Sequence, residues 1–240
     1  MKAPQSSKRS GKSFPPVEHR HLVDRVYDAL RRAIMEGSLP PGARLVEARV
    51  ATDMRVSRAP VREAIRALTD EGLVATQPRR GASVVTMSAQ DVWEVYTLRA
   101  ALEMYAFRLA QKRITPSQKS HLRSVVDKMR RSALDADSDV LSQLDVDFHE
   151  SVVRAAGNAR LLKAWMEMSG QVRLLSHRVI ATLYVDLQSV AQRHDLLLRA
   201  LVESAEGTDV ARLIEQHVYS AADRVMPHFG HSGFSEEGIK

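Results

Sequence analysis

Residues 55–72 read RVSRAPVREAIRALTDEG, and this stretch decides the fold of the first third of the chain. Apolar side chains recur at helical spacing on one side of it, and arginines recur every fourth residue on the other. Ser57 stands at an N-cap position, where its hydroxyl can accept from a free backbone N–H, and Gly72 ends the helix. We therefore predict a short helix with one buried and one cationic face. The buried face consists of Val61, Ala64, Ile65 and Leu68, and the cationic face of Arg58, Arg62 and Arg66.

Short predicted elements flank this helix on both sides. Apolar periodicity favours a helix before it, which ends at the Gly- and Pro-rich run of residues 37–42. After it, two β-prone segments enclose a basic turn, as in a hairpin. Three helices followed by a hairpin predict a winged helix-turn-helix domain. Its expected helices span residues 21–36, 47–54 and 58–71, and its strands span 73–76 and 82–85, on either side of the turn 77–81.

The positive charge of the chain is concentrated in this first part. The chain has 240 residues and a net charge of +6, but residues 1–85 alone carry 16 Lys and Arg against 9 Asp and Glu. Residues 86–240 are nearly neutral, with 19 basic against 20 acidic side chains. Such asymmetry is typical of a nucleic-acid-binding module joined to a module with another task. A short helix with exposed arginines suits the DNA major groove, although a solvated surface is the alternative.

Composition narrows the class of protein further. With 44% hydrophobic and only 5% aromatic residues, the chain favours packed helices over a β-sandwich. The absence of cysteine excludes disulfides, thiolate metal sites and cysteine nucleophiles. No apolar run approaches the length of a membrane span, and the basic N-terminus lacks the apolar core of a secretory signal. We therefore expect a cytoplasmic protein without a membrane partner.

Helical periodicity continues through the second module, without any strand pattern. This predicts a mainly α protein whose C-terminal part is an all-α bundle of about six helices. The expected helices span residues 89–112, 115–135, 140–156, 159–181, 187–205 and 209–226, with a polar linker at 136–138. The predicted domains are a disordered basic tail at 1–18, a winged helix-turn-helix domain at 19–86, an all-α domain at 87–226 and a loose tail at 227–240.

An ordered series of short motifs runs through the first module. They are Ile34–Gly37, Leu39, Pro41-Gly42, Leu45, Glu47, Val56–Ala64, Leu68, Glu71–Val74 and Arg79–Gly81. With these motifs the chain resembles the reader head of the GntR superfamily, and its helical remainder resembles the FCD-type effector domain of the FadR subfamily. The resemblance extends over about residues 20–226. It implies a DNA-binding transcription regulator whose helical domain dimerises and binds an effector.

The resemblance also implies which residues contact DNA. Two positions depart from the family pattern: Ala48 stands where some members have an arginine, and Arg55 stands where glycine is usual. Arg49 follows Ala48 and is the candidate substitute. Whether Arg58 and Arg62 contact bases or phosphates stays open, because a guanidinium can do either. The implied DNA-binding residues are Ser57, Arg58, Ala59, Arg62, Arg49, Arg80 and Gly81.

Four polar residues of the helical module have the spacing of metal ligands. Asp145 and His149 are four residues apart and share one face of a helix. His194 and His217 lie on the last two predicted helices, and an antiparallel pair would bring them to the same level. One aspartate and three histidines suit a divalent metal, with Zn²⁺ favoured and Ni²⁺ or Mn²⁺ as alternatives. Their order also resembles the metal-binding branch of the FadR-like effector domains, whereas ordinary polar core or surface residues are the other interpretation.

Two further positions are effector contacts implied by the resemblance. Arg99 matches a family arginine that faces the cavity and can clamp a carboxylate, and an internal ion pair with Glu103 is the alternative. Asn158 matches a family position near the cavity, although after Gly157 it can also cap a helix. A metal ion on one side and Arg99 on the other would suit a small organic acid as effector.

Three function classes follow from these features. The leading hypothesis is a homodimeric regulator, in most cases of this family a repressor, that binds a pseudo-palindromic operator in double-stranded DNA and responds to a small carboxylate. The second is a metal-dependent hydrolase, but the sequence has no nucleophile motif or phosphate loop, and we therefore expect no enzyme. The third is a DNA-binding protein without an effector, which would leave the neutral second module without a task.

Overall fold

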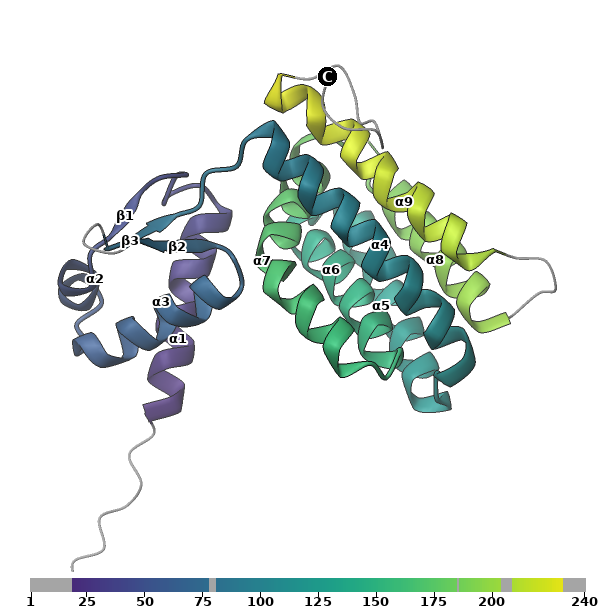
Figure 1. The fold of residues 1–240 in the computed structure, drawn as a ribbon, viewed down its shortest axis with the longest axis horizontal. Coiled ribbons are helices and arrows are strands. Elements are labelled where there is room, and N and C mark those ends of the chain that lie inside the picture. Colours follow the sequence, from purple (N-terminus) through teal and green to yellow (C-terminus); the bar gives the residue numbers. More distant parts are fainter. Residues whose placement is uncertain (1–18, 78–80, 185, 204–208, 231–240) are drawn as a thin grey trace, which may run out of the picture.

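The computed structural model describes residues 19–77, 81–184, 186–203 and 209–230. In this part of the chain, nine α-helices, one 3₁₀-helix and three short strands form two units (Figure 1). The predicted mainly α fold, a winged helix-turn-helix followed by a helical domain, is confirmed. The tail predicted at residues 1–18 lies outside the described residues.

The N-terminal unit, here called the head, consists of three helices and a small antiparallel sheet. Its elements are α1 (His19–Met35), β1 (Arg44–Leu45), α2 (Glu47–Asp53), α3 (Arg58–Asp70), β2 (Val74–Gln77) and β3 (Gly81–Val84). The central strand β3 pairs with both others, in the order β1-β3-β2. The sequence predicts the hairpin of β2 and β3 but not β1, because two residues carry no detectable alternation.

The structure confirms the predicted buried face and exposed face of α3. Val61, Ala64 and Leu68 are fully buried, and they pack with the apolar stripe of α1 in the core of the head. Ser57 occupies the N-cap position with an extended backbone, but its hydroxyl forms no capping hydrogen bond, so that expectation is wrong. Gly72 has a φ of 75° and follows the last turn of α3, as expected of a helix-ending glycine.

Arg55 lies in the turn between α2 and α3 with a φ of 55°, a left-handed conformation. Side chains with a Cβ adopt this region at a cost, and glycine adopts it freely. The turn therefore explains why glycine is the usual residue there. In this chain the turn keeps its geometry and also presents an additional exposed cation beside α3.

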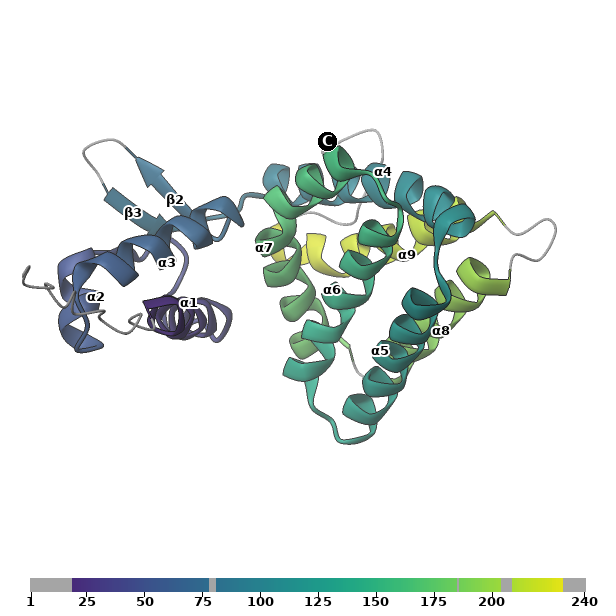
Figure 2. The same ribbon diagram turned by 90° about the horizontal axis from the view of Figure 1, so that it is seen from below.

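The C-terminal unit is a helical bundle. It contains α4 (Ala89–Arg113), α5 (Pro116–Leu134), α6 (Ser138–Ala155), α7 (Ala159–Thr182), α8 (Gln188–Glu203), α9 (Val210–Val225) and the 3₁₀-helix η1 (Met226–Phe229). Helix α6 packs against α4, α5 and α7, while α9 lies beside α4 and contacts α8 (Figures 1 and 2). Tyr96, Phe107, Phe148 and Trp165 fill the centre of this bundle. Within the described residues, no helix is long and apolar enough to cross a membrane.

Two predicted irregular segments are more ordered than expected. Helix α6 begins at Ser138, inside the predicted linker, because the Asp137 side chain accepts from the backbone N–H of Val140 and caps it. Met226–Phe229 forms η1, and Met226 is buried, so the predicted loose tail is wrong for residues 227–229. Residues 231–240 lie outside the described part of the chain.

The head docks on α7 of the bundle. The backbone N–H of Gly170 donates to the carbonyl oxygen of Glu71, at the end of α3, over 2.9 Å. A Cβ on Gly170 would overlap this oxygen, so the close approach requires glycine. One turn further along α7, Leu174 packs against the core of the head. Helix α7 is therefore one element through which the bundle contacts the DNA-binding unit.

Candidate metal centre and DNA-binding surface

The implied DNA-contacting residues of α3 form an exposed surface. Ser57, Arg58, Ala59 and Arg62 are all solvent-exposed at the N-terminal half of this helix. The Arg62 guanidinium is held by a neighbour: its Nη2 donates to Glu47 Oε2 over 3.0 Å, and its Nε lies 3.2 Å from both carboxylate oxygens. This pairing raises the pKa of Arg62, chiefly through the hydrogen bond to Glu47.

Glu47 is a residue that the sequence interpretation missed as part of this surface. It lies at the start of α2, 15 positions before Arg62, and no periodicity links the two. Because α2 packs against α3, the carboxylate reaches the guanidinium fork and fixes its direction. A DNA group that binds Arg62 must share this fork with Glu47 or displace it.

The remaining implied DNA contacts lie around α3. Arg49 on α2 has a side chain that is 84% exposed and is 3.8 Å from Asp53, so it is free to move toward a phosphate. Gly81 is the first residue of β3 and is exposed. Its φ of 81° lies in a backbone region that glycine adopts freely, as expected for a residue at the tip of a wing. Arg80 lies outside the described residues.

The structure brings the four predicted metal ligands together inside the bundle. Asp145 and His149 come from α6, His194 from α8 and His217 from α9, and one ligand atom of each lies within 4.8 Å of all the others. The first three side chains are buried and His217 is half-buried. His194 Nε2 lies 3.1 Å from Asp145 Oδ1 and 3.3 Å from His149 Nε2.

Neighbouring groups orient these ligands. His194 Nδ1 lies 2.8 Å from the carbonyl oxygen of Val190, to which it donates, so its Nε2 is left with a lone pair for the cluster. His149 Nδ1 lies 2.7 Å from Glu103 Oε2, which directs its Nε2 in the same way. The hydroxyl of Ser176 donates to Asp145 Oδ2. Ligand nitrogens held in this manner are typical of metal-binding histidines.

Glu103 links the ligand cluster to Arg99. It is fully buried on α4, and its Oε1 accepts from Arg99 Nε over 2.8 Å and from Trp165 Nε1 over 3.0 Å. Burial alone would raise the pKa of Glu103, but Arg99 and His149 hold it well below its usual range. The sequence interpretation considered Glu103 only as a partner of Arg99, because its contact with His149 depends on the packing of α4 on α6.

The electrostatics of the cluster favour an ionised Asp145 and neutral imidazoles at His149 and His217. Burial lowers the pKa of His149, and it lowers that of His217 further, with help from the neighbouring histidines. Although burial raises the pKa of Asp145, its hydrogen bond to His194 and its interactions with His149 and Arg99 hold this pKa well below its usual range. These are the protonation states that ligate a divalent cation.

The donor set and its spacing fit a metal ion. Ligand atoms that share one ion at bond lengths of about 2.1 Å are separated from one another by roughly 3.0–3.5 Å. The two nitrogen and oxygen spacings around His194, 3.1 and 3.3 Å, fall in this range. One carboxylate and three imidazoles suit first-row metals such as zinc. The cluster can therefore hold a divalent metal ion.

A small cavity adjoins the cluster. Its volume is about 20 Å³, and Arg99, Asp145, Tyr184, His194 and His217 are among its lining residues. Arg99 forms the ion pair with Glu103 through Nε, and its buried Nη2 has no hydrogen-bond partner within the described residues. Arg99 can therefore form the internal ion pair with Glu103 and still bind an effector carboxylate.

Two further residues, Tyr96 and Asn158, are not among the lining residues of this cavity. The buried hydroxyl of Tyr96, one turn before Arg99 on α4, has no partner among the described residues, and its position gave no signal in the sequence. Asn158 does not line the cavity. Its Oδ1 accepts from the backbone N–H groups of Arg160 and Leu161, so Asn158 caps α7, which was the alternative interpretation.

We predict that Glu103→Gln weakens metal binding about 10- to 100-fold, because it removes the carboxylate that orients His149. Metal affinity is measured by competition with a chromophoric chelator, on protein whose fold is checked by circular dichroism. Glu94→Gln is the matched control, since Glu94 is an exposed residue of the same helix and should leave the affinity unchanged. An unchanged affinity in folded Glu103→Gln protein would show that Glu103 does not position His149.

A winged helix-turn-helix head joined to a helical bundle with a buried cluster of metal ligands defines a DNA-binding transcription regulator with a sensory domain. The family description "Bacterial regulatory proteins, gntR family" matches residues 22–84, and "FCD domain" matches residues 94–220. The chain belongs to the GntR family of bacterial transcription regulators, in the group that carries an FCD domain.

Relatives and solved structures agree with this assignment. The chain is 30% identical over 211 residues to the probable D-xylose utilization operon transcriptional repressor of Paenarthrobacter nicotinovorans, covering 88% of this chain and 90% of that one. It is 32% identical over 182 residues to the gluconate operon transcriptional repressor of Bacillus subtilis (strain 168), covering 74% of each chain. The fold is similar to that of E. coli McbR/YncC, with a TM-score of 0.67 at 21% identity, covering 88% of this chain and 99% of that chain. Both curated relatives are named as repressors, which supports a regulatory rather than an enzymatic role.

Proposed function

We propose that this protein is a homodimeric repressor whose operator affinity is controlled by a small carboxylate bound beside a metal ion in the helical bundle. The observation that carries the proposal is the free Nη2 of Arg99, which lines the same cavity as three of the four ligand-cluster residues. A guanidinium and a divalent cation on two sides of one cavity select for an anion with carboxylate geometry.

The proposed cofactor is one divalent metal ion per chain. Its ligands would be Asp145, His149, His194 and His217, and three nitrogens with one oxygen favour Zn²⁺ over Ni²⁺ or Mn²⁺ in this proposal. A bound ion supplies positive charge that attracts a carboxylate oxygen. Glu103 and Val190 hold the imidazoles of His149 and His194 in the orientation that such an ion requires.

Effector binding would move the walls of the cavity. A volume of about 20 Å³ admits a water molecule but not an organic acid. The walls include α7, whose Ser176 contacts Asp145 on the cavity side. The same helix holds the head through Gly170. A displacement of α7 by the effector would therefore reposition the head. The protein would then have two head orientations with different affinities for DNA, as allosteric control requires.

The proposed dimer contact lies on α4. Leu98 and Tyr105 are about half exposed, and partly buried Leu102 and Leu109 continue the same face at helical spacing. An apolar stripe on a long surface helix can be covered by the same stripe of a second copy. Two heads related by a two-fold axis would then bind a pseudo-palindromic operator. This proposal requires two chains on each operator duplex.

The experiment that tests the effector site titrates metal-loaded protein with small carboxylates by calorimetry. Gluconate, the acid in the name of one relative's operon, is the first compound to test. We expect Arg99→Gln and Arg99→Lys to weaken carboxylate binding about tenfold or more, because both remove the guanidinium fork. Arg108→Gln, an exposed position on α4, should leave the affinity unchanged.

Arg99→Lys also protects the test against loss of the fold, because it keeps the positive charge beside Glu103. Metal content is measured on each variant, so that a loss of the ion is not mistaken for a loss of effector contacts. If carboxylates bind folded, metal-loaded Arg99→Lys protein as tightly as wild type, Arg99 is not the clamp.

A further inference from the structure

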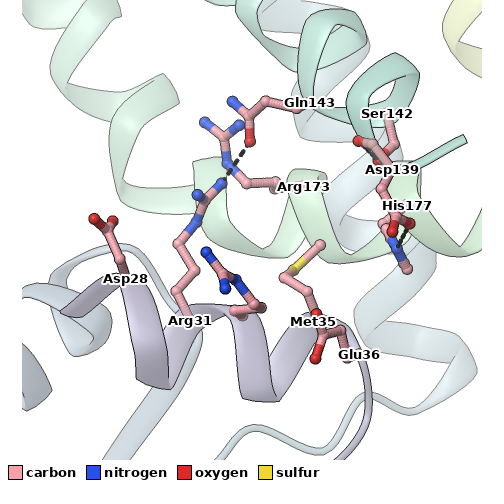
Figure 3. Close-up of a pocket in the computed structure, with 10 residues that line it drawn as sticks. Asp28, Arg31, Met35, Glu36, Asp139, Ser142, Gln143, Arg173 and His177 are labelled. Atoms are coloured by element: carbon pink, nitrogen blue, oxygen red, sulfur yellow. Dashed lines mark hydrogen bonds and ion pairs between the residues drawn. The ribbon is translucent and has the colours of Figure 1, made fainter. Parts of the chain in front are cut away.

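A second and larger cavity lies between the head and the helical bundle. Its volume is about 270 Å³, with α1 of the head as one wall and α6 and α7 of the bundle as the other (Figure 3). It is distinct from the metal-ligand cavity, with which it shares no lining residue. A cavity of this size approaches the range of sites for small molecules.

Two guanidinium groups from the two units meet in this cavity. Arg31 projects from α1 and Arg173 from α7, and Figure 3 shows both side chains extending toward each other beside Gln143. Arg31 Nη2 donates to Gln143 Oε1 over 2.9 Å. Burial lowers the pKa of Arg173, and the neighbouring Arg31 lowers it further, while the carboxylates of Asp147, Glu71 and Glu150 partly offset this. The two like charges therefore destabilise each other unless an acceptor lies near both.

Several donors of these arginines lack an acceptor. Within the described residues, Arg31 Nε and the Nε and Nη1 of Arg173 are buried without a hydrogen-bond partner. The Arg173 side chain is only 11% exposed, so water has limited access to it. Buried donors without partners are costly and rare in folded proteins. Within the described residues, three donors of the two arginines that line this cavity therefore have no hydrogen-bond acceptor, although Arg173 Nη1 lies 3.5 Å from Asp147 Oδ1.

Three carboxylates lie near Arg173, those of Asp147, Glu71 and Glu150, but none accepts a hydrogen bond from the three donors, and Glu71 accepts from the Tyr27 hydroxyl. Asp147 Oδ1 is 3.5 Å from Arg173 Nη1 and already accepts from Gln143 over 2.6 Å. Glu150 lies 4.0 Å from Arg173 and is bound to Arg154 over 2.7 Å. On the far side, Asp139 is paired with His177 over 3.0 Å.

The acidic residues of the α1 wall are also not paired with these cations. Asp28 and Glu36 form no ion pair within 4.0 Å with an arginine in the described part of the chain. Arg32 adds a third guanidinium to the same wall. The lining of the cavity therefore combines three guanidinium groups with the carboxylates of Asp28, Glu36 and Asp139, and within the described residues none of these carboxylates forms an ion pair with Arg31 or Arg173.

We propose that this cavity binds a small oxyanion, such as inorganic phosphate or a dicarboxylate, that bridges Arg31 of the head and Arg173 of the bundle. Guanidinium forks match the oxygen spacing of both anion types. Because the two arginines belong to different units, the anion cross-links them and stabilises the docked orientation of the head. The site is separate in space from the proposed carboxylate site beside the metal ion, and it gives the regulator a second anionic input.

The test is a calorimetric titration of the full-length, metal-loaded protein with inorganic phosphate and, separately, with succinate, at constant ionic strength set with KCl. We expect at least one of the two anions to bind, and Arg31→Gln and Arg173→Gln each to weaken that binding about tenfold or more. Arg25→Gln is the matched control, because Arg25 is an exposed residue of α1 that does not line the cavity. Whichever anion binds more tightly identifies the preferred oxyanion.

The variants also separate this site from the metal cavity. Arg99→Lys should bind the anion as wild type does, whereas an anion held at the metal centre would be weakened by Arg99→Lys and not by Arg31→Gln. That pattern overturns the proposal, and so does the absence of binding by both anions to wild-type protein. Because Arg31 is only half-buried, we expect Arg31→Gln to fold. This variant therefore tests the anion site even if Arg173→Gln does not fold.

Discussion

Wild-type protein purified without chelators is expected to carry about one equivalent of divalent metal per chain, and Asp145→Ala and His194→Ala each to lose it. Asp145 and His194 come from different helices, α6 and α8, and their ligand atoms lie 3.1 Å apart. Removal of either leaves an incomplete donor set. Metal content is measured by plasma mass spectrometry. His121→Ala, an exposed histidine on α5, is the matched control and should keep the metal.

Metal removal is also expected to destabilise the protein. A ligand present at 100 to 1,000 times its dissociation constant stabilises the folded state by about 2.7–4.1 kcal/mol. For a chain of this size, that corresponds to a fall in Tm of roughly 5–15 °C on addition of EDTA. The variants, which hold no metal, should show no such fall.

A wild-type protein that is metal-free and indifferent to added Zn²⁺, Ni²⁺ or Mn²⁺ would contradict the metal site. Asp145 and its three histidines would then be a polar lining of the bundle, held by their mutual contacts. The search for the effector would have to start from Arg99 alone. The assignment of the chain to its family and its DNA-binding head would not change.

The ligand cluster could be predicted because the pair of Asp145 and His149 is local to one helix and because the order of all four residues resembles that of the metal-binding branch of the family. The four-residue spacing of Asp145 and His149 fixes a common face, and the positions of His194 and His217 along the chain predict that both lie at the same level of two antiparallel helices. Glu103, Tyr96 and Ser176 could not be found in this way. Each reaches the site only because α4 or α7 packs on α6, and a single sequence does not encode that packing in any periodicity.

In the head, too, features with a local sequence period could be predicted, whereas contacts between separate elements could not. The faces of α3 follow from a 3.6-residue period, so its core and its exposed arginines are correctly predicted. The strand β1 is too short to carry a pattern, and the pair of Glu47 with Arg62 joins two helices. The unused hydroxyl of Ser57 illustrates a further limit, because a residue type favoured at a position does not guarantee the bond that makes it favourable.

Arg62→Ala is expected to abolish specific operator binding while the fold and the metal content survive. Arg62 is exposed on α3, and its fork points in a direction set by Glu47. A bidentate contact with guanine contributes about 1–3 kcal/mol of discrimination. Because a dimer uses two copies of the residue, the loss should reach about 2–6 kcal/mol, or roughly 30-fold and more in affinity.

The experiment begins with an operator selected from random duplexes by the wild-type protein. Affinity is then measured by fluorescence anisotropy at fixed salt for specific and non-specific duplexes, and mass photometry counts the chains on each operator. Arg108→Ala, on the exposed face of α4, is the control for general loss of positive charge. Unchanged specific affinity in Arg62→Ala would remove this residue from the DNA interface, and a stoichiometry of one chain per duplex would contradict the proposed dimer.

Arg62→Lys separates the two roles that the sequence leaves open. A lysine keeps the charge for a phosphate but lacks the planar fork that recognises guanine. If Arg62 reads a base, as its exposed and pre-oriented fork favours, Arg62→Lys should lose specific binding and keep the non-specific affinity. If Arg62 contacts a phosphate, the lysine variant should retain most of both. The same substitution also weakens the pair with Glu47, so a gain in non-specific binding would indicate that Glu47 restrains Arg62 in the DNA-free protein.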